Sequence, residues 1–112
     1  SLDIERDRNV LYRETSAGPI ENEYIVKIFN KAQTERTHRV EVQGHPGLQL
    51  ELPDNRLTVA PSRKLELPFN VQMAPVELAG ATNIPITFTV TATDDDDVQA
   101  EAESRFMAPQ VR

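Results

Sequence analysis

The sequence contains no cysteine. This absence excludes disulfide bonds, thiolate metal sites, cysteine-ligated iron–sulfur clusters and thiol nucleophiles within the chain. The sequence also has no apolar run near the roughly 18–20 residues that a membrane helix needs, and no signal-peptide pattern at its N-terminus. Glycine-rich phosphate loops and serine–histidine–acid motifs are missing too. The chain is therefore expected to contribute no catalytic residue and to hold no cofactor.

Positive charge is scarce relative to negative charge. The 12 lysines and arginines face 18 acidic residues, which gives a formal net charge of −6. Phosphate backbones and anionic lipid would repel such a chain, so nucleic acid is not an expected partner. What the sequence does have is 112 residues with 38% hydrophobic content, which is enough for one domain with a two-layer core.

Apolar and polar residues alternate with a period of two, as in strands with one buried face. Residues 84–92 show this most clearly, with Ile86 and Phe88 on one face and threonines on the other. Similar alternating runs, separated by turn signals, cover residues 39–43, 48–52, 65–71 and 98–106. Residues 24–29 are apolar on both faces apart from Lys27, as in a more central strand, and residues 10–13 and 57–59 are candidates for two further strands. Within residues 65–71, Pro68 predicts an edge position or a bulge. The pattern predicts an all-β fold, an immunoglobulin-like β-sandwich of seven to eight antiparallel strands.

The most conspicuous local feature is a run of four aspartates, Asp94, Asp95, Asp96 and Asp97. Several carboxylate oxygens could bind Ca²⁺. The alternative is a solvated hairpin turn between two strongly alternating strands, because aspartate tolerates turn geometry. The spaced ligands, glycine and distal glutamate of an EF-hand loop are missing, so the sequence favours the turn.

A second candidate site consists of residues that could bind copper, namely His38, His45, Met73 and Met107. His38 lies in an alternating segment and His45 in the turn between Gly44 and Gly47, and neither has a histidine two or four residues away. The sequence therefore favours structural roles for both, and no metal site is predicted. The copper hypothesis requires at least two of the four residues to meet in space.

The N-terminal residues Arg6, Asp7, Arg8 and Asn9 form a third candidate, for contact with a partner or with lipid headgroups. Arginines in such a stretch also pair with acidic neighbours, and surface ion pairs are commoner and individually weak. The same stretch begins the most distinctive motif of the chain.

That motif is Arg6-Asp7-Arg8-Asn9-Val10-Leu11-Tyr12-Arg13-Glu14, followed by Glu21-Asn22-Glu23-Tyr24 and Lys27-Ile28-Phe29-Asn30-Lys31. With Val42-Gln43-Gly44 and the final Ser104-Arg105-Phe106-Met107-Ala108-Pro109, it resembles the C-terminal domain of the FixG/CcoG/RdxA proteins, which are accessory proteins of cbb3-type cytochrome c oxidase. The resemblance covers nearly the whole chain. One departure is Ala108, where the family usually has glycine.

The resemblance implies a parent protein with membrane helices and two [4Fe–4S] clusters held by cysteines elsewhere. It places residues 1–8 in a membrane-proximal linker and the sandwich in residues 9–109, with residues 110–112 as a tail, on the periplasmic side of the inner membrane. We expect a non-catalytic interaction module, with Arg6–Asn9 and Tyr12 as contact residues and an oxidase subunit, an assembly factor or the parent's own membrane part as partner. The alternative is a copper-binding or copper-sensing domain.

Overall fold

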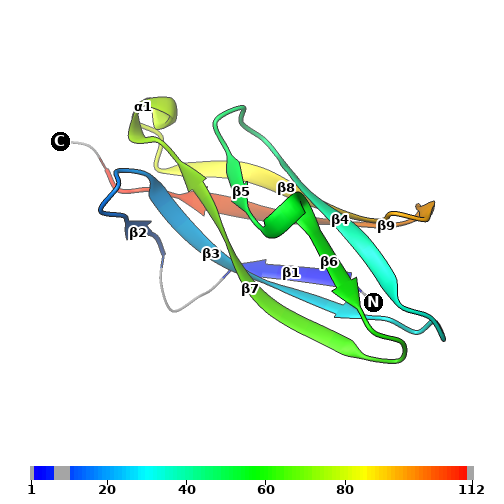
Figure 1. Cartoon of the computed structure of the whole chain (residues 1–112). Coiled ribbons are helices and arrows are strands. Elements are labelled where there is room, and N and C mark those ends of the chain that lie inside the picture. The colour runs from blue at the N-terminus through cyan, green and yellow to red at the C-terminus, as the bar shows by residue number, and fades with distance from the viewer. Residues whose placement is uncertain (1, 7–10, 111–112) are drawn as a thin grey trace.

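The computed structural model describes residues 2–6 and 11–110, and these residues form two packed β-sheets with two short helical elements between strands (Figure 1). The strands are β1 (Leu2–Arg6), β2 (Arg13–Glu14), β3 (Ile20–Phe29), β4 (Arg36–Gln43), β5 (Gln49–Glu51), β6 (Arg56–Val59), β7 (Lys64–Met73), β8 (Asn83–Ala92) and β9 (Asp95–Met107). The helical elements are a 3₁₀ turn, η1 (Pro53–Asn55), and α1 (Pro75–Leu78). Within the described part of the chain, no helix is long and apolar enough to cross a membrane.

Both sheets are antiparallel. One sheet has the order β1-β3-β7-β5, with β2 also paired to β3, and the other has the order β6-β4-β8-β9. The predicted immunoglobulin-like sandwich is therefore confirmed, with nine strands in the described residues where seven to eight were expected. The strands expected from strict alternation are present, and residues 74–81 contain one helical turn. The alternation fixes which side chains face inward, because successive residues of a strand point to opposite faces.

Strand β1 corrects the predicted linker. Leu2–Arg6 pair with β3 from Ile28 to Tyr24, and Ile4 is buried in the core. The sandwich therefore begins at Leu2, and the prediction that residues 1–8 form a linker is wrong for this segment. Ile4 alternates with charged neighbours, as a half-buried edge strand requires. Part of the first strand expected over residues 10–13 lies outside the described residues, and only Arg13–Glu14 are seen to pair with β3.

Pro68 lies in β7, opposite Ile25 of β3, in an unbroken register. The other neighbour of β7, strand β5, pairs only with Asn70, Val71 and Gln72. The β5 partner thus leaves the Pro68 side of β7 uncovered, although β7 itself is an internal strand of the sheet. The predicted edge position therefore does not hold for the strand as a whole, and the register shows no bulge at Pro68.

The core between the sheets is centred on three aromatic rings. Tyr24 and Phe69 are neighbours in one sheet, with ring centroids 5.7 Å apart, and Phe88 of the other sheet packs edge-on against both at 4.9 and 5.5 Å. Edge-on and offset pairs contribute about 0.5–1.5 kcal/mol each beyond burial. Aliphatic side chains from both sheets surround the rings, so the two layers bury one continuous core.

The two ends of the sandwich are far apart, because the molecule is 53 Å long and only 25 by 21 Å across. We call one the α1 end, which consists of residues 15–19, 44–48, 74–82 and 108–110. The other is the hairpin end, which consists of the loops 30–35 and 60–63 and the β8–β9 turn with the first residues of β9. Figure 1 shows α1 and the end of β9 at one end and the hairpin loops at the other.

Candidate functional site

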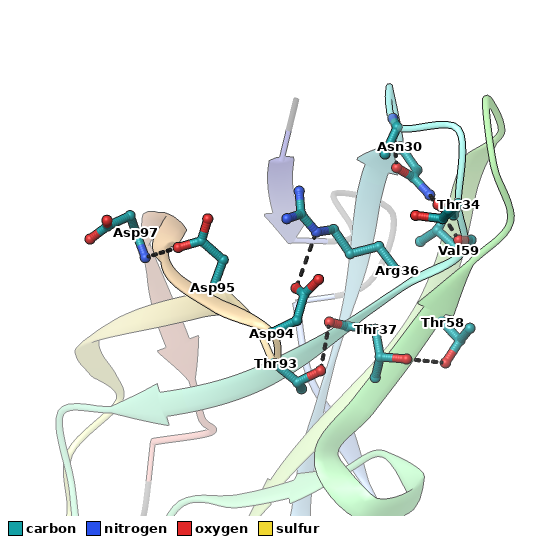
Figure 2. A network of polar contacts seen from close by, with 11 residues as sticks. Asn30, Thr34, Arg36, Thr37, Thr58, Val59, Thr93, Asp94, Asp95 and Asp97 are labelled. Atoms are coloured by element: carbon teal, nitrogen blue, oxygen red, sulfur yellow. Dashed lines mark hydrogen bonds and ion pairs between the residues drawn. The ribbon is translucent and has the colours of Figure 1, made fainter.

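The aspartate run lies at the hairpin end, where the chain reverses at Thr93 and Asp94 and β9 begins at Asp95. The Arg36 Nε donates to Asp94 Oδ1 at 3.3 Å, and the Asp97 N–H donates to Asp95 Oδ1 at 3.0 Å. Figure 2 shows the Asp94 carboxylate turned toward Arg36 and the Asp97 carboxylate turned away from it. The carboxylates therefore have separate partners. In the described residues, no three His, Cys, Asp or Glu side chains are grouped so as to hold a metal ion.

The Asn30 side chain connects the two loops of the hairpin end, residues 30–35 and 60–63, by hydrogen bonds. The side chain is buried, and Nδ2 donates to the carbonyls of Thr34, Val59 and Ala60 at 2.9, 3.0 and 3.2 Å (Figure 2). Its Oδ1 accepts the Ala32 N–H at 2.9 Å. Backbone bonds from Asn30 to Arg63 and from Ser62 to Ala32 join the same two loops. The loops 30–35 and 60–63 are thus one polar, well-connected unit.

His38 is buried near the same end, with 3% of its surface exposed. It lies in β4, as the alternation predicted, and lines an open cleft of about 400 Å³ together with Leu2, Ile28, Asp97 and Ala100. Its Nδ1 is buried and has no hydrogen-bond partner. Burial lowers the pKa of His38. The Arg36 guanidinium lowers it further, and Asp94 opposes them. The imidazole is therefore held neutral at neutral pH.

The structure does not bring the two histidines of the copper hypothesis together. His38 lies five residues before the end of β4 at Gln43, roughly 17 Å at the rise of an extended strand, and His45 lies beyond that end. The His45 Nδ1 accepts the Gly47 N–H at 2.9 Å, which closes the turn. Met73 is fully buried at the end of β7, and Met107, half-buried, ends β9 in the other sheet.

Two of the predicted contact residues can be placed. Arg6 ends β1 opposite Tyr24, and its Nη1 is buried and has no hydrogen-bond partner. Tyr12 is half-buried and packs against the core. Asp7, Arg8 and Asn9 lie outside the described residues.

Sequence reasoning missed the polar pair that joins the two sheets. The Asn22 Nδ2 donates to the Met107 carbonyl at 2.8 Å, and the Met107 N–H donates to Asn22 Oδ1 at 2.9 Å. The Tyr24 hydroxyl donates to the Arg105 carbonyl at 2.7 Å. Burial raises the pKa of Tyr24, although Arg6 opposes the rise, so the phenol remains a donor.

The signal for this pair was present in the sequence. Asn22 has the same parity as Ile20, Tyr24 and Val26, and a polar residue on an apolar face is expected to find a buried partner. The partner is the backbone of β9, which inserts Phe106 into the core between the two bonded residues. The Glu-Asn-x-Tyr motif is thus a clamp between β3 and β9.

The fold therefore defines this chain as an immunoglobulin-like sandwich domain, in which the clamp joins the two sheets. The family model described as "IG-like fold at C-terminal of FixG" matches residues 1–109, and its description provisionally calls FixG an oxidoreductase. The crystal structure of a FixG-related protein from Vibrio parahaemolyticus is similar, with 29% identity and a TM-score of 0.81 over 96% of this chain and 94% of that one.

This chain belongs to the family of immunoglobulin-like domains at the C-terminus of FixG, as the resemblance predicted. A structure from Archaeoglobus fulgidus, at 14% identity and a TM-score of 0.49 over 99% of this chain and 98% of that one, is too distant to support any inference. No protein with a curated description matches the chain.

Proposed function

We propose that this chain is a non-catalytic docking and structural module of a membrane-bound iron–sulfur protein that takes part in maturation of cbb3-type cytochrome c oxidase. Membership of the FixG family supports this parentage. The observation that supports the module role is the clamp: Asn22 and Tyr24, polar residues of the most distinctive motif, use their side-chain hydrogen bonds to join the two sheets. Outer faces and loops then remain for contact with other proteins.

The redox centres belong to other parts of the parent protein. Cysteine thiolates hold [4Fe–4S] clusters, and this chain has no cysteine, so its residues do not fit such a cluster. The resemblance supports a position next to the membrane on its periplasmic side. The copper alternative has less support, because His38 lies far from His45 and the His45 Nδ1 already accepts the Gly47 N–H.

The experiment replaces residues 2–109 in the full-length protein with an unrelated β-sandwich of similar length. We expect the iron–sulfur clusters to form, as measured by electron paramagnetic resonance, while active oxidase decreases and partner proteins no longer co-purify. Because the unrelated sandwich fills the same space, a loss of oxidase activity cannot be explained by the missing length of the domain. If oxidase activity and co-purifying proteins are both unchanged, the docking role is wrong.

A further inference from the structure

Charge is distributed unevenly between the two ends of the sandwich. At the hairpin end, the loops and the first residues of β9 carry Lys31, Glu35, Arg63 and the aspartate run. At the α1 end, four segments meet, namely residues 15–19, 44–48, 74–82 and 108–110. Among these described residues, Glu77 is the one with a formal charge. In a chain with 27% charged residues, such a charge-poor end is unusual.

The α1 end also exposes an apolar side chain beside an apolar groove. Val76 projects from α1 with 83% of its surface exposed, more than the other exposed large hydrophobic residues, Leu11 at 54% and Phe29 at 41%. The groove, of about 360 Å³, is lined mainly by apolar residues such as Ile20, Leu78 and Pro109, and one charged residue, Glu14, also lines it. Exposed apolar surface on a soluble domain often marks an interaction site, and depletion of charge is typical of the centre of an interface.

The segments of the α1 end are held together by close contacts and backbone hydrogen bonds. Gly47 sits against α1 so closely that a Cβ there would lie 2.9 Å from the Cβ of Glu77. The Ala108 N–H bonds to the Thr82 carbonyl, and the Ala81 N–H to that of Leu78. The four segments therefore present Val76 and the groove in a fixed arrangement, which limits the entropy lost on binding.

We propose that the α1 end is the docking surface of this module, and that its partner is a different protein with an uncharged apolar surface that receives Val76. This inference rests on the proposed docking function and names its site. A charged partner surface is disfavoured, because burying an unpaired charge against apolar groups is costly. The end of a molecule that is only 25 by 21 Å across offers a small contact, whereas a stable dimer of two copies buries about 800 Å² per partner. The contact is therefore a transient one.

The test places the photocrosslinker p-benzoylphenylalanine at position 76 of the full-length protein in cells, and separately at Gln33, an exposed residue of the hairpin end. Irradiation should give an adduct with another protein from position 76 and none from position 33. The crosslinked peptide of that protein, identified by mass spectrometry, should be apolar and free of charged residues.

The protein so identified is then purified and titrated with the full-length FixG-type protein. Val76→Asp should weaken binding by at least tenfold, and the matched control Gln33→Asp should leave it within twofold. Binding should also change less than twofold between low and high salt, because charge contributes little to the contact.

Four results would overturn the docking surface. Adducts from position 33 alone would leave the module role intact and move the site to the hairpin end. Adducts between two copies of the chain, or with lipid, would contradict a different protein as partner. Binding that falls steeply with salt would contradict the uncharged contact. No adduct at either position, together with unchanged oxidase in the domain replacement, would remove the proposed function as well.

Discussion

The clamp near the α1 end and the histidine near the hairpin end are both buried polar groups, but they differ in their partners. Each polar side-chain atom of Asn22 and Tyr24 bonds to the backbone of β9. The Nδ1 of His38 is equally buried and has none. A satisfied buried group contributes modestly to stability, whereas an unsatisfied one costs the full desolvation of its polar atom. The comparison indicates that the sandwich is held more firmly at the clamp than at His38.

The largest effect should come from removing the clamp. Asn22→Ala leaves the N–H and the carbonyl of Met107 without their partner in a part-buried site. We expect a loss of about 2–4 kcal/mol in unfolding free energy, because each orphaned group costs about 1–3 kcal/mol. Urea denaturation of the isolated domain measures it. The matched comparison is Thr37→Val, which removes only a hydrogen bond between the exposed hydroxyls of Thr37 and Thr58 at the hairpin end and should cost no more than about 1 kcal/mol. Equal losses would contradict the comparison.

Tyr24→Phe tests the second hydrogen bond of the clamp with a smaller change in structure. The ring keeps its contacts with Phe69 and Phe88, and only the hydrogen bond to the Arg105 carbonyl is lost. We expect about 1–2 kcal/mol of destabilisation. The double variant with Asn22→Ala should lose less than the sum, because both residues hold the same stretch of β9. Strict additivity in denaturation experiments would mean that the two bonds act independently.

His38 makes stability depend on pH. Its pKa in the folded state lies below the ordinary 6.5 of histidine, so the unfolded chain binds the proton more readily. Stability from this group is therefore complete above pH 6.5 and falls as the pH drops from 6.5 toward the folded-state pKa. Denaturation midpoints at pH 7.5, 6.5 and 5.5 should fall with acidification, and His38→Leu should flatten that slope. An unchanged slope in the variant would assign the effect to other groups.

The smallest effect belongs to the exposed end of α1. Val76→Asp should change the unfolding free energy by no more than about 0.5 kcal/mol, because surface substitutions away from structural features rarely do more. Thermal unfolding checks this, with Leu78→Asp, at a buried position of the same helical turn, as the destabilising counterpart. A large loss from Val76→Asp would mean that Val76 supports the fold and would weaken its role in docking.

Features that depend on neighbouring residues could be predicted from the sequence, whereas features that depend on contacts between distant residues could not. Strand β8 was predictable, because its alternation is local and nearly strict. Strand β1 was missed, since three of the five residues from Leu2 to Arg6 are charged and its pairing with β3 lies some twenty residues away in the sequence. The depth of His38 followed from alternation, but its missing partner depends on side chains from several other strands.

The candidate sites likewise combine local features, which the sequence predicts, with long-range contacts, which it does not. The aspartate run was predicted as a turn, yet the reversal involves only Thr93 and Asp94, because a register shift at Thr91 and Ala92 carries Asp95 into β9. Asn22 could be recognised as a buried polar residue from its parity. Its partner Met107 could not, since the contact joins residues 85 positions apart.

Hydrogen exchange at the Met107 amide tests most directly whether the motif residues close the sandwich. This N–H donates to the Asn22 side chain, so its protection depends on that one group. The account predicts slow exchange in the native domain and exchange at least a hundredfold faster in Asn22→Ala, with the β8 amides little changed. Rapid exchange of Met107 in the native domain, or protection that survives Asn22→Ala, would contradict it.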